Sequence, residues 1–351
     1  MINYEIKKIF SGATIKTILS IIMIIFIIST VYMAKGINNT NEIYDGHDKY
    51  SEEVYEEIKQ KHGEYILEIM ENHEDSIKLK EIGEKYSSVV MAYPVYEKIH
   101  NRIDNIRIFQ TYNNWNSDLK YTYDKNETYE IENFTGWENF IINEWFFIAS
   151  FLSVIVVSIA VCCSDNKVGN KKVIYSTKAG KEKIIDAKKT TILSFAAIFT
   201  LGYFVLQLVI YMLFGLKLSL LDAGLYQVQG FELASSYTSI GKYLFFELLG
   251  LLVLNLFAAL FVYFSSTILN KHVYIYVITA FAIIIAIMLK DFSWITPANF
   301  YEPKMFFDNI NEISIGNVVL SKYFINIIVT VVLTVLLTIV GNYINKKTEE
   351  D

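Results

Sequence analysis

Long apolar runs alternate with polar segments along this 351-residue chain. An apolar run needs about 20 residues to cross a bilayer as a helix. The pattern predicts six such helices, over residues 13–34, 140–163, 190–214, 241–269, 273–289 and 322–345. The predicted fold class is therefore an all-α polytopic membrane protein with six transmembrane helices.

The N-terminal residues 1–12 place Ile2, Ile6, Ile9 and Phe10 near one helical face. This spacing predicts an amphipathic connecting helix that lies in the membrane interface. A signal peptide is the alternative for the first ten residues and the apolar run behind them, because the start is basic. The run is long for a signal peptide and no Ala-x-Ala site follows, which favours a retained membrane anchor.

The polar segment at residues 35–139 is long enough for a small folded domain. Residues 35–143 contain 22 acids and 12 lysines or arginines, so the segment is acidic. Apolar residues recur at helical spacing on both sides of Pro94, and the proline should separate two helices. We expect a helix-rich domain. Its histidines lack the close spacing of metal ligands, which favours surface histidine over a metal site; they are His47, His62, His73 and His100.

The segment at residues 164–189 carries eight lysines against three acids. Lysine excess between two spans predicts the cytoplasmic side. Six spans then place both termini in the cytoplasm, with Lys346 and Lys347 in the tail 346–351, and make residues 35–139 extracellular. Residues 215–240 become an extracellular loop, and the aromatic segment 290–321 becomes extracellular or re-entrant. This charge asymmetry is typical of a plasma-membrane protein and not of a nucleic-acid-binding one.

Aromatic residues crowd the outer end of the second predicted span, at Trp137, Trp145, Phe146 and Phe147. Such clusters are typical of the belt that anchors a helix at the membrane surface. The two cysteines, Cys162 and Cys163, are adjacent at the other end of this span. They offer no disulfide framework; packing is the favoured role and palmitoylation the alternative.

Sequence motifs for catalysis are missing. The chain has no phosphate-binding Gly-x4-Gly-Lys-Ser/Thr loop, no His-Glu-x-x-His, no Gly-x-Ser-x-Gly and no Cys-x-x-Cys. We therefore expect a protein that is not an enzyme, with no catalytic residue, metal site or cofactor of its own.

Polar residues inside the apolar runs are the remaining candidates for function. Glu247 and Asn255 fall in the fourth run, roughly 80° apart around the helix. Gln207 in the third run and Asn326 in the sixth could join them. A carboxylate inside the bilayer is costly and should be neutral, paired or facing water. The four residues either line a transport path or fix helix packing through hydrogen bonds.

The layout of nearly the whole chain resembles the permease subunits of ABC-2 (type V exporter) ABC transporters. The closest local likeness lies between the second and third spans, where the family shows an acid, a glycine and a Leu-x-Ser…Arg…Lys run. The matching positions here are Asp165, Gly169, Tyr175, Ser176, Lys181 and Lys188. Asp replaces a common Glu, and lysine replaces the arginine. The chain is similar to the members with an extracellular insert after the first span.

The resemblance implies a coupling helix in residues 164–189 that docks on a cytosolic ATPase. With Gly180, the six matching positions form the expected coupling set. The implied partners are a dimer of ABC ATPase subunits, which would bind ATP and Mg²⁺, a second permease subunit of the same or a homologous kind, and membrane lipid. An exporter of a peptide, drug, lipid-like or ionic cargo is the favoured function. A non-transporting sensor or scaffold with a ligand-binding outer domain is the alternative, and an ion-driven carrier is a third.

Overall fold

The computed structural model describes residues 6, 12–36, 50–73, 76–113, 134–163, 178–228, 230–231, 238–269, 274–282, 312–315 and 318–347. Five helical stretches within them are long and apolar enough to cross a membrane, at 13–34, 135–163, 183–213, 240–268 and 322–344. The prediction of a helical, multi-pass membrane protein is confirmed at this level. The predicted span 273–289 is described over 274–282, which is helical. Most of the predicted segment 1–12, and residues 290–311 of the predicted segment 290–321, lie outside the described residues.

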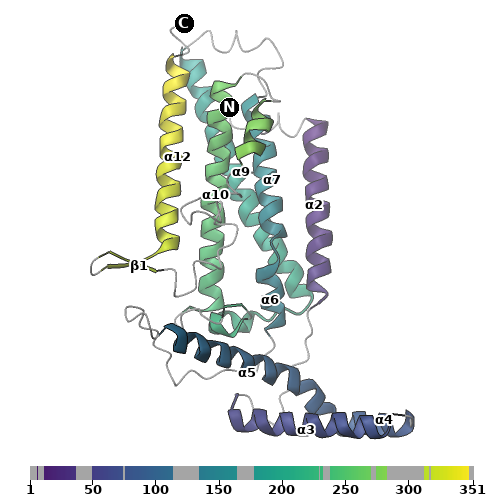
Figure 1. The fold of residues 1–351 in the computed structure, drawn as a ribbon. Coiled ribbons are helices and arrows are strands. Elements are labelled where there is room, and N and C mark those ends of the chain that lie inside the picture. The colour runs from purple at the N-terminus through teal and green to yellow at the C-terminus, as the bar shows by residue number, and fades with distance from the viewer. Residues whose placement is uncertain are drawn as a thin grey trace.

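Helices α7 (Trp145–Cys163), α9 (Lys178–Leu213) and α10 (Ile240–Ile268) pack together at the centre of a bundle. Helices α2 (Ala13–Ala34) and α12 (Lys322–Lys347) lie on its two flanks (Figure 1). Both flanking helices leave many large apolar side chains exposed. Exposed apolar surface of this extent is unfavourable in water, so these flanks suit lipid or another protein.

The contact between α12 and α10 uses small and polar side chains. Asn326 and Thr330 are fully buried, and Thr334 and Thr338 continue their face with hydroxyls bonded to carbonyls one turn back. A Cβ atom on Gly341 would lie 3.4 Å from the Tyr263 ring. Small residues let helix backbones approach closely, which is how helices associate in membranes.

The second predicted span, 140–163, is interrupted. Helix α6 (Thr135–Ile142) ends at Ile142, and α7 begins at Trp145 after a two-residue break. The Asn143 Oδ1 atom accepts a hydrogen bond from the Trp145 backbone N–H, at 3.2 Å. The helical stretch therefore starts five residues earlier than predicted and contains a polar break.

Residues 214–231 cap one end of the bundle; we call it the hairpin end, because α3, α4 and α5 lie there (Figure 1). The segment contains the short 3-10 helices η3 (Leu218–Asp222) and η4 (Leu225–Gln227), and an isolated bridge joins Gly224 to Ser239. Gly215 has a φ of 101°, which L side chains rarely adopt. The predicted loop 215–240 is thus partly a packed cap, because its leucines cover the ends of α6, α9 and α10.

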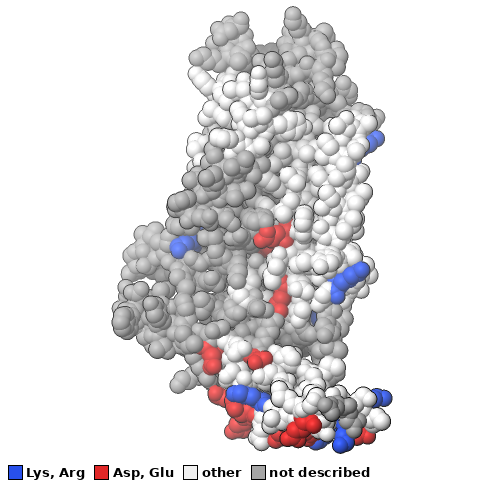
Figure 2. Space-filling model, turned by 45° about the vertical axis from the view of Figure 1, so that its right-hand side comes forward, with Lys and Arg blue, Asp and Glu red and all other residues white. Residues whose placement is uncertain are grey.

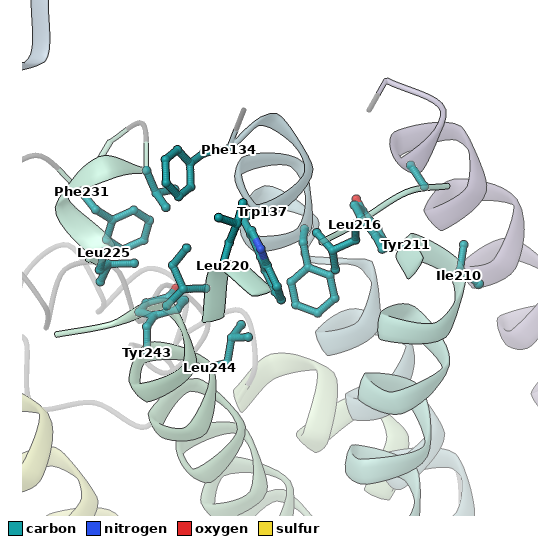
Figure 3. Packing of buried hydrophobic residues seen from close by; sticks show 14 residues of the cluster. Phe134, Trp137, Ile210, Tyr211, Leu216, Leu220, Leu225, Phe231, Tyr243 and Leu244 are labelled. Atoms are coloured by element: carbon teal, nitrogen blue, oxygen red, sulfur yellow. The ribbon is translucent and has the colours of Figure 1, made fainter. Parts of the chain in front are cut away.

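Trp137 lies at the centre of this cap (Figure 3). The side chain is 1% exposed, and its Nε1–H donates to the Lys217 carbonyl at 3.0 Å. Phe146 is also buried, whereas Trp145 is 38% exposed. The prediction of an aromatic belt is therefore wrong for Trp137 and Phe146, because Trp137 packs in the cap and Phe146 packs between α2, α9 and α10.

Helices α3 (Glu52–Glu71), α4 (Ser76–Lys85) and α5 (Ser87–Asn113) form a separate unit at the hairpin end. Buried residues of α5 are spaced alternately by three and four positions and face α3; they are Val89, Ala92, Tyr96, Ile99 and Ile103. This is the spacing of two helices that pack lengthwise. The prediction of a helix-rich unit in residues 35–139 is met over the part that is described.

Helix α5 runs through Pro94, so the predicted helix break at that residue is wrong. A proline inside a helix costs about 3 kcal/mol, because it removes a hydrogen bond and crowds the preceding turn. The apolar stripe on either side of Pro94 buries against α3, and this burial offsets the cost.

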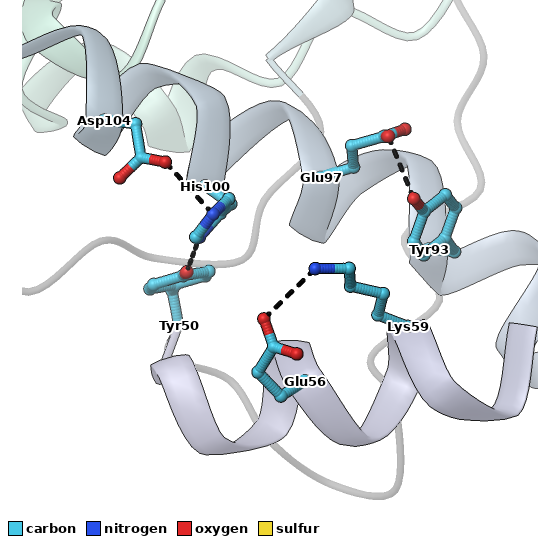
Figure 4. A network of polar contacts seen from close by, with 7 residues as sticks. All are labelled: Tyr50, Glu56, Lys59, Tyr93, Glu97, His100 and Asp104. Atoms are coloured by element: carbon cyan, nitrogen blue, oxygen red, sulfur yellow. Dashed lines mark hydrogen bonds and ion pairs between the residues drawn. The ribbon is translucent and has the colours of Figure 1, made fainter. Parts of the chain in front are cut away.

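Polar side chains line the seam between α3 and α5 (Figure 4). The Tyr50 hydroxyl lies 2.8 Å from His100 Nδ1, and His100 Nε2 lies 3.2 Å from the Asp104 carboxylate. The Tyr93 hydroxyl donates to Glu97 at 2.9 Å. Desolvation and this carboxylate raise the pKa of Tyr93 to about 12.

Gly63 lies in the middle of α3, and a Cβ atom there would meet nothing within 4 Å. We expect Gly63→Ala to raise the free energy of unfolding of this unit by about 0.5–1 kcal/mol, because alanine loses less entropy in a helix. Slower hydrogen exchange of the α3 amides in the full chain would show it. Gly241→Ala is the control, because its Cβ would lie 3.2 Å from the Leu221 carbonyl oxygen and should give no gain.

Glu68 on α3 accepts hydrogen bonds from Lys85 at the end of α4, at 2.6 Å, and from Tyr86 in the turn before α5, at 2.8 Å. These bonds lower the pKa of Glu68. The contribution of Glu68 to folding stability is therefore present above its unfolded-state pKa and is lost as the pH falls through its folded-state pKa. We expect acid to speed amide exchange in α3 and α4 more in the native chain than in Glu68→Gln. Equal acid sensitivity of the two chains would contradict this.

Strands β1 (Glu312–Ile315) and β2 (Val318–Ser321) form an antiparallel pair directly before α12. They fall in the segment 290–321 that was predicted to be extracellular or re-entrant. The described part of the chain is otherwise helical, so the all-α expectation needs this one small correction.

Candidate functional site

The four predicted intramembrane polar residues are all buried. Gln207 lies on α9, Glu247 and Asn255 on α10 and Asn326 on α12, and their exposure is between 0% and 5%. They do not form one cluster. Glu247 and Asn255 are separated by about 12 Å along α10, at about 1.5 Å per residue. Their surroundings differ, so each is described in turn.

Asn255 joins the three central helices. Its Nδ2 donates to Thr200 Oγ1 on α9 at 2.7 Å and to Ser150 Oγ on α7 at 3.2 Å. Both hydroxyls are fully buried and donate in turn to carbonyls of their own helices. Between the same helices, Ser153 and Tyr203 also share a hydrogen bond, at 3.0 Å. This polar layer, here called the Asn255 layer (Ser150, Ser153, Thr200, Tyr203 and Asn255), holds α7, α9 and α10 in register.

Gln207 occupies the break between α6 and α7. Its Nε2 donates to the carbonyl of Phe140 at 3.1 Å and lies 3.4 Å from that of Asn143. Tyr211, one turn further along α9, accepts from Asn143 Nδ2 and donates to the Asn139 carbonyl. A helix break leaves carbonyls without partners, which is tolerated inside a membrane protein only where side chains satisfy them. Helix packing was one of the two roles predicted for Gln207, but the helix break that it stabilises was not predicted.

Glu247 lies two turns from the start of α10 and is 5% exposed. Its Oε2 atom has no hydrogen-bond partner among the residues that the structure describes. Tyr243, one turn earlier, is buried in the cap, and the nearby Tyr323 hydroxyl donates to the Phe246 carbonyl. A buried carboxyl oxygen without a partner is costly, so the Glu247 carboxyl should be neutral or accept a hydrogen bond from a group outside the described residues.

Asn326 lies in the first turns of α12, and its Oδ1 is 3.5 Å from the Thr330 hydroxyl. It continues the polar face that packs on α10, and no hydrogen bond among the described residues links it to Glu247 or to the Asn255 layer. Asn326 therefore contributes to the packing of α12 on α10.

Two lysines of the predicted coupling segment are built into the bundle. Helix α9 begins at Lys178 and has 36 residues, about 54 Å, so its first turns extend past any hydrocarbon layer. Lys188 is 6% exposed, and its Nζ donates at 3.2 Å to the Cys162 carbonyl at the end of α7. Lysine at a helix C-terminus satisfies carbonyls and the helix dipole.

Lys189, the next residue, contacts three further groups. Its Nζ donates to Asn342 Oδ1 on α12 at 2.9 Å, lies 3.3 Å from Asp186, and lies 5.7 Å from the centre of the Tyr263 ring on α10. Lys188 and Lys189 thus connect the start of α9 to α7, α10 and α12; we call this pair the lysine junction. The sequence showed only an excess of lysine here, not which lysines would be buried.

The remaining coupling residues are described in part. Gly180 and Lys181 lie in the first turn of α9. Asp165, Gly169, Tyr175 and Ser176 lie outside the described residues. Within the described ranges, no group of three or more His, Cys, Asp or Glu residues could hold a metal ion. His62 and His100 instead stack on Tyr93 and Tyr55, at ring-centre distances of 4.0 and 4.1 Å.

Comparisons with protein-family models, with curated proteins and with solved structures each found no match to this chain.

Proposed function

We propose that this chain is the membrane-spanning permease subunit of an ATP-driven transporter of the ABC-2 class. The proposal includes six spans, cytoplasmic termini and an extracellular domain over residues 35–139 in the plasma membrane. A dimer of ATPase subunits would supply the energy, and a second permease subunit would complete the path. The cargo would be exported and is a peptide, drug, lipid-like molecule or ion.

The lysine junction is the observation that supports this proposal most. It lies at the end of the bundle opposite the hairpin end, in the last residues of the segment 164–189 that is expected to dock on the ATPase. A displacement of the first turns of α9 acts on α7 through Lys188 and on α12 and α10 through Lys189. Packed helices shift as near-rigid bodies, so force on this segment would move the bundle as a unit.

Replacement of residues 176–181 by a Gly/Ser stretch tests the proposal. We expect an ATPase to co-purify with the native chain and to be lost from the variant, while membrane insertion is unchanged. A Gly/Ser replacement of residues 232–237, on the predicted outer side, is the matched control and should keep the ATPase. A variant complex that still contains the ATPase would reject the docking role.

A non-transporting sensor or scaffold is the second candidate. The separate hydrophobic core of α3–α5 favours it, because that unit does not need the bundle for its own packing. The sensor hypothesis expects ligand binding at the outer unit with no ligand-stimulated ATP turnover. Turnover by the purified complex, measured with and without ligand, separates the two candidates.

A further inference from the structure

The outward side of α3 combines two features that a solvated helix rarely needs together. Ile66, Leu67 and Met70 share one side, and they are 39%, 60% and 65% exposed. Gly63, one turn earlier on the same side, adds no side chain above them. The apolar strip formed by Ile66, Leu67 and Met70 is not part of the α3–α5 core, which takes Tyr55, Ile58, Tyr65 and Ile69 from this helix.

A stripe of carboxylates runs beside this apolar strip. At about 100° per residue, Glu53, Glu57, Glu64 and Glu71 fall within an arc of about 40°. Helix α3 holds seven glutamates and two lysines, a net charge of −5. Lys61 pairs with Glu57, whereas no described residue forms an ion pair with Glu53, Glu64 or Glu71. Figure 2 shows acidic side chains gathered over this unit.

We propose that the outward face of α3 binds a cationic amphipathic peptide. A helix with leucine-like side chains on one side and lysine or arginine beside them would cover the apolar strip and neutralise the carboxylate stripe. Burial of exposed apolar surface supplies the affinity, and opposite charge supplies orientation and a fast encounter. The proposal that this face binds a peptide depends only on the residues of α3. Its use as a capture site for exported cargo rests on the permease function proposed above.

The position and charge of α3 argue against two other occupants of this face, a lipid bilayer and a second copy of the chain. Helix α5 lies between α3 and the bundle, so the outward face of α3 points away from a bilayer that the bundle crosses (Figure 1). The carboxylates would also repel anionic lipid headgroups. A second copy of the chain would set one carboxylate stripe against another, which is unfavourable across a symmetric interface.

The test uses the full chain in nanodiscs of zwitterionic lipid and a fluorescent helical peptide built from leucine and lysine. We expect binding above that of empty nanodiscs, weakened by salt. The double variant Leu67→Ser/Met70→Ser should bind about tenfold more weakly, as expected for the loss of two apolar contacts. Glu64→Lys/Glu71→Lys should bind about tenfold more weakly and show less salt dependence.

Matched controls lie on the same unit. Met91→Ser on α5 removes an apolar residue that is 48% exposed, and Glu81→Lys on α4 reverses an exposed charge; both should bind like the native chain. Three results would overturn the proposal. They are no binding above empty nanodiscs, equal binding of a leucine–glutamate peptide, and self-association that disappears in Leu67→Ser/Met70→Ser. ATPase co-purification is measured on the same samples, so loss of the permease function and loss of this surface are told apart.

Discussion

Trp137→Ala is expected to lower the free energy of unfolding by about 3–5 kcal/mol, the cost of emptying a buried aromatic site. The residue lies in the cluster where α6, α9, α10 and the 214–231 cap meet. Its ring packs edge-on against Phe140, with ring centres 5.6 Å apart, and its indole N–H satisfies a carbonyl of the cap. Alanine cannot fill the space that the indole ring leaves, because four segments of chain surround this space and hold its shape.

Reversible unfolding of the full chain in mixed micelles measures this effect. Trp145→Ala is the control, because Trp145 is 38% exposed and leaves no comparable cavity. We expect Trp137→Ala also to speed amide exchange in residues 214–228, since the cap loses its central contact. If both tryptophan variants lose the same stability, Trp137 acts as an ordinary surface anchor and the packed cap is refuted.

Asn255→Leu should destabilise the bundle by about 1–3 kcal/mol, the second largest effect. The change removes two interhelical hydrogen bonds, each worth about 0.6–1.7 kcal/mol in a membrane protein. It also brings a branched side chain into a fully buried site. The loss is expected in unfolding measurements on the full chain and needs no transport assay.

A double-mutant cycle separates helix packing from a transport path. Thr200→Val removes the hydroxyl that receives the shorter of the two bonds from Asn255, at 2.7 Å. If Asn255 fixes packing, the two variants should couple by about 1 kcal/mol in stability. Additive stabilities combined with lost transport would instead assign Asn255 to the path. Asn326→Leu serves as the comparison and should not couple to Thr200→Val, because no described contact links the two residues.

Much of the bundle could be predicted because membrane spans follow from a local property, the length of an apolar run. The first span was predicted at residues 13–34, where α2 begins and ends. Helices α10 and α12 are described over their whole length, and both start and end within two residues of their predicted bounds. The α6–α7 break was missed because the partner that stabilises it, Gln207, is more than 60 residues away in the chain.

The amino-acid sequence by itself determined the class of this protein: its apolar runs require helices that cross a membrane, and its acidic segment at 35–139 requires a separate polar unit. Tertiary structure alone decided what the polar residues do. It placed Asn255 with Ser150 and Thr200, assigned Gln207 to a helix break, buried Lys188 and Trp137, and kept α5 continuous through Pro94. Apolar burial is set by composition over a window of residues, whereas a hydrogen bond or a filled cavity depends on two surfaces that meet only after folding.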